Sequence, residues 1–321
     1  EILSGLVGSE MCIRDRGSQS IGMGKMLYDN FSCAKQVFDE VDDALDEKLS
    51  SLMFSGDIEE LTLTYNAQPA IMAVSIAVIR VLESMGLDIS KDVQVVAGHS
   101  LGEYSALCAA GVYSLRDTTR LLRIRGLAMQ NAVPQGVGAM CAIIGLEISQ
   151  LEKICNQIKS ENGICEIAND NGGGQLVLSG EKLAVEKAAI LAKDMDAKRV
   201  VFLPVSAPFH CSLMKPAADK MLQALEQITP NKPVVPILPN ITVNLQIDAD
   251  AIAGLLVEQI VGRVRWRETV EWFAANDISH IYEIGWGKIL TNLAKRINKE
   301  LVAMPVYEIA EIENCLKLIQ E

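Results

Sequence analysis

Residues 93–107, VQVVAGHSLGEYSAL, decide the fold of this chain. The β-branched run at their start predicts a short buried strand, and the segment 103–110 is rich in residues that favour a helix. Between the two, residues 98–102 match the pattern G-x-S-x-G, whose glycines permit a sharp turn. The strand and the helix indicate a nucleophile elbow rather than a chance match in a loop. The sequence therefore predicts that Ser100 is a nucleophile.

A nucleophilic serine needs a base and a group that stabilises an oxyanion. The N–H of Leu101, at the start of the predicted helix, is placed to stabilise the oxyanion. The chain has 3 histidines that could supply the base. His99 lies inside the turn with its side chain directed away from the serine, and His280 begins a predicted strand. His210 follows a proline-containing loop at the end of a predicted strand, where α/β sheets gather catalytic groups, and is the predicted base.

Composition narrows the class of protein. The chain has 321 residues, half of them apolar, which is enough for a large core. Its net charge of −12 disfavours nucleic-acid binding over a wide surface, and an acidic partner would need a local basic patch. The longest apolar run, residues 70–79, is about half of what a membrane span needs. The scattered cysteines, without a C-x-x-C pair, favour free thiols in the cytoplasm and disfavour a metal site.

The order of the predicted elements indicates the fold class. Strands and helices alternate, which is typical of an α/β protein with a parallel sheet. Residues 134–203 change this rhythm, because their order is β-α-β-β-α-β, which predicts a ferredoxin-like subdomain. We expect this subdomain to be inserted into one α/β catalytic domain that comprises residues 1–133 and 204–321. The glycine-rich turn at 169–174 is interpreted as a hairpin, since no helix begins on it.

Two long helices are predicted before the elbow. The segment from Lys25 to Leu45 is amphipathic and is expected to form one continuous helix. Residues 70–85 are apolar on nearly all sides, which predicts a buried helix. Pro69 is expected near the first position of that helix, where a missing N–H costs nothing.

With these motifs in place, the chain resembles the malonyl-CoA:acyl carrier protein transacylases of bacterial type II fatty-acid synthesis. The resemblance runs from Gly17 to near the C-terminus. The matching motifs are GSQ at 17–19, QP at 68–69, GHSLGEY at 98–104, RG at 125–126, MQ at 129–130, PFH at 208–210, MKP at 214–216 and YE at 282–283. The resemblance implies a hydrolase-like α/β domain with an inserted ferredoxin-like subdomain, in agreement with the predicted order of elements.

The resemblance also implies catalytic roles. Ser100 would carry the malonyl group as an ester. His210 would take the serine proton and return a proton to the leaving thiolate. A backbone carbonyl at the position of Gln259 would orient the histidine, so no aspartate is expected to complete a triad.

Recognition of the malonyl group is assigned through the resemblance as well. Arg125 would bind the free carboxylate of malonate through a bidentate pair. Spacing alone does not separate this arginine from Arg120 and Arg123 on the same predicted helix. The family motif, arginine followed by Gly126, selects Arg125.

Further residues are expected to line the pocket. The resemblance places Gln19, Gln68 and Asn169 there, and Phe209 is expected to form a wall beside the malonyl α-carbon. A second oxyanion donor would be the backbone N–H of Arg16, which stands where the family has a glutamine.

These assignments imply a ping-pong acyl transfer. Malonyl-CoA would acylate the serine, coenzyme A would leave, and the phosphopantetheine thiol of acyl carrier protein would take the malonyl group. The coenzyme A thioester is a substrate, no metal or redox cofactor is required, and a cytoplasmic monomer without a membrane or nucleic-acid partner is expected. One alternative is a serine hydrolase, such as a thioesterase or lipase, whose pocket would lack the carboxylate-binding arginine. A catalytically idle scaffold is another alternative.

Three departures from the family pattern stand out. Residues 1–16 do not read as the Val/Ile/Phe-rich first strand of the family. Our hypothesis is that they are foreign sequence fused before Gly17, which would remove that strand and lower stability. Trp286 replaces a proline, and residues 262–266 read GRVRW where the family has N-P-V-x-W.

Overall fold

A computed structural model describes residues 9–10, 19–205 and 207–320. The strands of its larger part are β1 (Ser9–Glu10), β2 (Val96–Ala97), β7 (Ile237–Leu238), β8 (His280–Ile284) and β9 (Val302–Val306). Three of them form a parallel sheet in the order β1-β8-β9, and β2 pairs in parallel with β7. Strand β1 also contacts β2, so the two sheets lie next to each other. The expected α/β class with a parallel sheet is confirmed.

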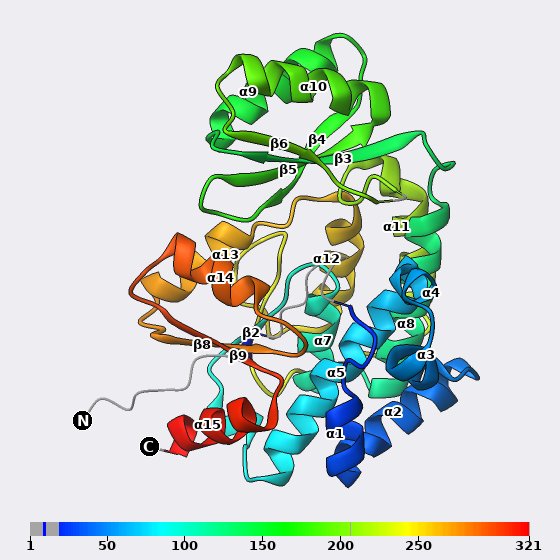
Figure 1. The fold of residues 1–321 in the computed structure, drawn as a ribbon, viewed down its shortest axis with the longest axis vertical. Helices are drawn as coiled ribbons and strands as arrows, with labels where there is room; N and C mark the ends of the chain where they lie inside the picture. Colours follow the sequence, from blue (N-terminus) through cyan, green and yellow to red (C-terminus); the bar gives the residue numbers. More distant parts are fainter. Residues whose placement is uncertain (1–8, 11–18, 206, 321) are drawn as a thin grey trace.

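Helices surround these strands (Figure 1). Those that precede residue 134 are α1 (Lys25–Asn30), α2 (Ser32–Leu45), α3 (Leu49–Ser55), α4 (Ile58–Thr62), α5 (Thr64–Ser84), α6 (Ile89–Asp92), α7 (Gly102–Ala109) and α8 (Leu115–Asn131). Those that follow residue 203 are the 3-10 helix η1 (Ser212–Met214), α11 (Lys215–Leu225), α12 (Ala249–Val261), α13 (Trp266–Ala275), α14 (Ile289–Ile297) and α15 (Ile309–Gln320).

Helix α5 is the core helix of the larger part. By length and composition it could cross a membrane. However, 83% of its apolar 18-residue stretch is buried inside the protein, where the helix packs against α2, α7 and α8. It begins at Thr64 and contains Pro69, so our expectation that the proline lies near the first position is wrong. Close packing explains the longer helix. A Cβ on Gly126 of α8 would lie 2.5 Å from the Cα of Tyr65, so the first turn of α5 is pressed against α8.

The single helix expected from Lys25 to Leu45 is also wrong. The chain breaks at Phe31, which is extended and separates α1 from α2. The break carries α1 across α2 and brings the ring of Tyr28 to 6.0 Å from Phe38 and 5.1 Å from Phe54. Burial of this aromatic cluster, rather than a glycine or proline, therefore ends the first helix.

Residues 138–202 form a second layer with its own sheet and core. Its elements are β3 (Gly138–Ile144), α9 (Ile148–Ser160), β4 (Cys165–Asp170), β5 (Gln175–Glu181), α10 (Lys182–Asp194) and β6 (Arg199–Phe202). The sheet is antiparallel, in the order β4-β5-β3-β6. Figure 1 shows α9 and α10 on the outer face of this sheet, while the other face is turned toward the rest of the protein. The glycine-rich turn joins β4 to β5, as expected of a hairpin.

The N-terminal segment departs from expectation at the two residues that can be described. Ser9 and Glu10 pair in parallel with Tyr282 and Glu283 of β8. The prediction that residues 1–16 lack a strand is therefore wrong at these positions, because backbone hydrogen bonds do not require apolar side chains. The expected oxyanion donor at Arg16 lies outside the described residues.

Candidate active site

The strand, turn and helix expected around Ser100 are present. Strand β2 ends at Ala97, α7 begins at Gly102, and Ser100 between them has a φ of +54°. A residue other than glycine is rarely held in this left-handed conformation, and where one is, the strain often marks a functional position. A Cβ on Gly98 would lie 2.0 Å from the carbonyl carbon of Gly102, so the turn is closed only with glycine at position 98.

Ser100 and His210 form a direct pair although 110 positions separate them in the sequence. The serine Oγ lies 2.7 Å from the histidine Nε2, and both residues are buried. The histidine Nδ1 lies 2.8 Å from the backbone oxygen of Gln259 on α12. A carbonyl oxygen only accepts, so Nδ1 carries the proton and Nε2 is free to accept the serine hydroxyl proton.

Arg125 of α8 is fully buried beside this pair. One terminal nitrogen donates to the Gln68 side-chain oxygen at 2.7 Å. The other donates to Ser100 Oγ at 3.1 Å and to Gln259 Oε1 at 2.9 Å. Within the described residues no carboxylate lies within ion-pair distance of this guanidinium. The side chain therefore brings a buried positive charge to the serine.

The other two arginines of α8 point elsewhere. Arg120 donates to the backbone oxygen of Ala44, and Arg123 pairs with Glu47 at 2.7 Å. Only Arg125 of the three candidates reaches Ser100 in the structure.

Two buried donors beside the serine lack acceptors. Arg125 Nε and Gln68 Nε2 have no hydrogen-bond partner among the described residues. A buried donor without an acceptor costs roughly 1–3 kcal/mol, so an incoming acceptor at these two nitrogens is favoured.

Asn240, which sequence reasoning missed, fixes the turn. Its side-chain oxygen accepts the N–H of Ser100 at 2.8 Å, and its amide nitrogen donates to the backbone oxygen of Gly98 at 2.5 Å. The residue follows β7, the neighbour of β2, so the carboxyl ends of two adjacent strands meet here. The signal in the sequence was the segment 235–240, VPILPN, which ends in this asparagine two residues after an apolar pair, at a strand end of the kind that carries functional groups.

Glu103, in the first turn of α7, is a buried carboxyl close to the same residues. Burial raises the pKa of Glu103 to about 7, although hydrogen bonds from Asn240 and Gln259 and the charge of Arg125 act in the opposite direction. Burial also raises the pKa of Tyr104, whose ring lies 5.4 Å from the Arg125 guanidinium.

The remaining predicted residues are distributed around this cluster. Leu101 immediately precedes α7, and its N–H has no acceptor among the described residues. Gln19 donates to Thr62 at 3.2 Å. Phe209 is buried in the main core next to His210, and Asn169 lies on β4.

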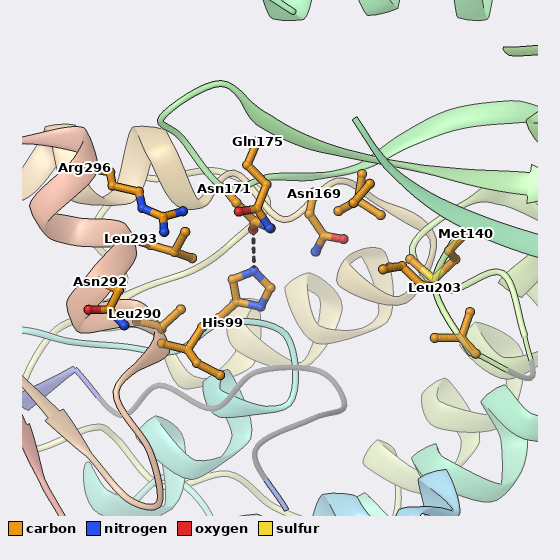
Figure 2. Close-up of a pocket in the computed structure, with 14 residues that line it drawn as sticks. His99, Met140, Asn169, Asn171, Gln175, Leu203, Leu290, Asn292, Leu293 and Arg296 are labelled. Atoms are coloured by element: carbon orange, nitrogen blue, oxygen red, sulfur yellow. Dashed lines mark hydrogen bonds between the residues drawn. The ribbon is translucent and has the colours of Figure 1, made fainter. Parts of the chain in front are cut away.

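A cavity of about 250 Å³ lies next to the serine turn, between the second layer and α14 (Figure 2). Its lining is rich in amide side chains and includes Asn169 and Asn171. His99 points into it, away from the serine turn, and its Nε2 lies 2.9 Å from Asn171 Oδ1. Arg296 of α14 also lines the cavity (Figure 2) and is exposed, so it adds a positive charge there.

Comparison with known proteins assigns the chain that carries this site to a family. The acyl transferase domain family matches residues 15–311. The chain belongs to this family. Sequence comparison supports the assignment, because this acyl transferase is 43% identical to the malonyl CoA-acyl carrier protein transacylase of Bacillus subtilis strain 168 over 306 residues, 95% of each chain.

Solved structures agree with the assignment to the acyl transferases. An acyl-carrier-protein S-malonyltransferase from Bartonella henselae is 55% identical, with a TM-score of 0.95 over 98% of this chain and 100% of that one. A malonyl-transacylase in complex with its type II PKS acyl-carrier protein is 40% identical, with a TM-score of 0.92 over 98% of this chain and 99% of that one. The predicted resemblance is thereby confirmed, and the chain is an acyltransferase.

Two of the family departures have contacts of their own in this acyl transferase. Trp286 packs against Tyr307 with ring centroids 5.2 Å apart. Arg263 lies 3.6 Å from Glu152 of the second layer. Among the described residues, neither side chain has a hydrogen bond to the serine or to His210, Arg125 or Asn240.

Proposed function

We propose that this acyltransferase moves a malonyl group from malonyl-CoA to the phosphopantetheine thiol of acyl carrier protein, through a malonyl ester of Ser100. The observation that carries the proposal is the buried Arg125, which contacts the serine oxygen at 3.1 Å and has no carboxylate contact among the described residues. A buried charge is stable only when it is paired, and the carboxylate of malonate supplies the pair. An apolar acyl group would leave the arginine uncompensated, which argues against a lipase.

Acylation follows from the geometry of the nucleophile elbow and the Ser-His dyad. His210 Nε2 takes the hydroxyl proton as Ser100 Oγ attacks the thioester carbon. The backbone oxygen of Gln259 keeps Nδ1 protonated and stabilises the imidazolium that forms. The same imidazolium then protonates the departing coenzyme A sulfur. The N–H of Leu101, which has no acceptor in the described part of the chain, is available to the oxyanion.

The malonyl carboxylate accepts from two donors that have no partner among the described residues. Arg125 Nε and Gln68 Nε2 lie on adjacent side chains that already share a 2.7 Å hydrogen bond. A carboxylate has two oxygens, each able to accept more than one hydrogen bond, so it can pair with both donors. Recognition of the carboxylate and attack on the thioester then occur within one buried cluster.

Transfer to the carrier protein reverses the same chemistry. The phosphopantetheine thiol loses its proton to His210 as its sulfur attacks the malonyl ester, and Ser100 recovers its hydroxyl. We assign the cavity lined by His99, Asn169 and Asn171 to the polar arm of either thiol, because its amides match the amides of pantetheine. These steps use no metal or redox cofactor, and we expect a cytoplasmic monomer.

We also propose that residues 134–203 form a ferredoxin-like subdomain inserted into a catalytic domain of residues 1–133 and 204–321. The antiparallel order β4-β5-β3-β6 and the two helices on one face support this classification. The separate core of this segment supports the boundaries.

Malonyl transfer is tested by incubating the protein with malonyl-CoA, with and without holo-acyl carrier protein. We expect malonyl-carrier protein as the main product, little free malonate, and a mass increase of one malonyl group on the peptide that contains Ser100. Release of malonate at the same rate with and without carrier protein would instead identify a hydrolase. No acylated peptide and no product would identify an inactive scaffold.

A further inference from the structure

Glu103 occupies a position that the mechanism has not used. It lies in the first turn of α7, three residues after the nucleophile, and only 2% of it is exposed. One of its carboxylate oxygens, Oε2, accepts the backbone N–H of Asn240 at 3.0 Å and the Nε2 of Gln259 at 2.8 Å. A single buried oxygen therefore joins Asn240, in the loop after β7, to Gln259, which lies in α12.

The two residues that Glu103 holds are those that position the reacting groups. Asn240 accepts the N–H of Ser100. Gln259 donates to the backbone oxygen of Ser100 at 2.9 Å and accepts from Arg125. Its own carbonyl oxygen orients His210.

Glu103 is costly to the fold, which argues against a purely structural role. Burial raises its pKa to about 7 from an ordinary 4.5. The pKa of this carboxyl is higher in the folded than in the unfolded protein, so its ionisation disfavours the folded state. The free energy of unfolding therefore decreases as the pH rises from 4.5 to about 7. The charged or titratable groups that face it are Arg125 and Tyr104, and only the arginine favours the ionised form. Residues kept at the expense of stability commonly serve function.

We propose that Glu103 is a positioning residue that keeps Ser100, His210 and Arg125 aligned through Asn240 and Gln259. The proposal rests on the roles assigned above to those three residues. When Glu103 is ionised, its oxygen satisfies both donors at once. When it is protonated, the proton can reside on Oε1, which accepts neither hydrogen bond, and Oε2 becomes a neutral acceptor. Hydrogen bonds to a neutral oxygen are weaker than those to a carboxylate, so the contacts to Asn240 and Gln259 weaken. Misplacement of about 1 Å costs roughly 10²-fold in rate, so acylation decreases.

Two substitutions separate the hydrogen bonds from the charge. Glu103→Ala removes the acceptor, and we expect kcat to fall by about 10- to 100-fold, with a smaller change in KM. Glu103→Gln keeps an oxygen that can accept both hydrogen bonds but cannot ionise. We expect kcat at pH 8 to lie between the values of Glu103→Ala and the wild type, because a neutral oxygen accepts more weakly than a carboxylate. Below pH 7 its rate should fall less steeply than that of the wild type, because position 103 no longer takes up a proton. Its melting temperature at pH 8 should be at or above that of the wild type.

Asp42 supplies the matched control. It is also a buried carboxylate, 3% exposed, that accepts from a backbone N–H and a side chain, both of Ser50, but on α2 and away from the site. We expect Asp42→Asn to lower the melting temperature without moving kcat or the acid limb of kcat/KM.

Specific outcomes would overturn the inference. One is a wild-type kcat for folded Glu103→Ala. The other is a plot of kcat/KM against pH for Glu103→Gln whose decrease at low pH coincides with that of the wild type. If Glu103→Ala does not fold, the acid limb of Glu103→Gln decides alone. Ser100→Ala measured in parallel keeps the two proposals distinct: if it is still acylated, the proposed function fails, whereas normal Glu103 variants beside an inactive Ser100→Ala overturn only this inference.

Discussion

The serine cluster and the neighbouring cavity are built in opposite ways. The serine cluster consists of Ser100, His210, Arg125 and Gln259, all at most 1% exposed and joined by hydrogen bonds of 2.7–3.1 Å. Among the described residues that line the cavity, one hydrogen bond joins two side chains, those of His99 and Asn171, and Arg296 is exposed. One region is fixed before substrate arrives, and the other is able to adjust.

This difference indicates how each region contributes to catalysis and to substrate binding. Groups that stabilise a transition state gain most from being held in place beforehand, in surroundings that exclude water. A cavity that receives two different thiol carriers gains more from polar groups that can change partner. We therefore expect large effects from substitutions in the serine cluster and small effects in the cavity.

The largest effects are expected at the nucleophile and base. Ser100→Ala should abolish formation of the malonyl-enzyme, and His210→Ala should reduce its rate by roughly 10⁴- to 10⁶-fold, because the two act as one unit. Quenched-flow measurement with labelled malonyl-CoA gives both rates. Ser105→Ala, a change at another buried serine of α7, is the control and should react normally. Malonyl label on Ser100→Ala would refute the assignment.

The second effect concerns the choice of acyl group. Arg125→Ala should weaken malonyl transfer by about 2–5 kcal/mol, roughly 30- to 5,000-fold, because the malonyl carboxylate would be buried without its partner. Acetyl-CoA lacks this carboxylate and should be used at least as well as by the wild type. The ratio of kcat/KM for the two thioesters measures the effect, with Arg123→Ala as the control. Equal losses for both thioesters would assign the carboxylate to another residue.

The sequence predicted the serine cluster better than it predicted what holds the cluster together. The turn at 98–102 is local, so its spacing alone identified Ser100. Arg125 was selected only through the family resemblance, because three arginines share its helix. Asn240 and the role of Glu103 were missed, since their contact joins positions 137 residues apart and no local pattern reports it.

The same limit explains the errors in the fold. The break at Phe31 and the early start of α5 are set by packing between helices, and neither carries a glycine or proline at the position where the helix ends or begins. The elements of the second layer were predictable because each strand and helix follows its own periodicity. The cavity was not, because His99, the β4–β5 turn and α14 come together only in the folded chain.

A smaller effect is expected at Phe209, which lies beside the base but belongs to the main core. If its ring closes the space near the malonyl α-carbon, Phe209→Ser should admit methylmalonyl-CoA more readily. Rejection of one methyl group is worth about 1–3 kcal/mol, which sets the upper limit of the change. The measurement is the ratio of kcat/KM for methylmalonyl-CoA and malonyl-CoA, taken on protein whose melting curve shows it is folded. An unchanged ratio would place the wall elsewhere.

The smallest effect is expected in the cavity and tests the contrast with the serine cluster directly. Asn171→Ala removes the 2.9 Å contact to His99 and one amide from the lining. A single neutral hydrogen bond contributes about 1 kcal/mol, so KM for malonyl-CoA should rise roughly five-fold while kcat stays near the wild-type value. Asn156→Ala, at an exposed asparagine on α9 of the same layer, is the control and should change neither constant. A fall in kcat as large as that of the serine-cluster variants would contradict the contrast, because it would mean that the cavity is as rigidly organised as the cluster.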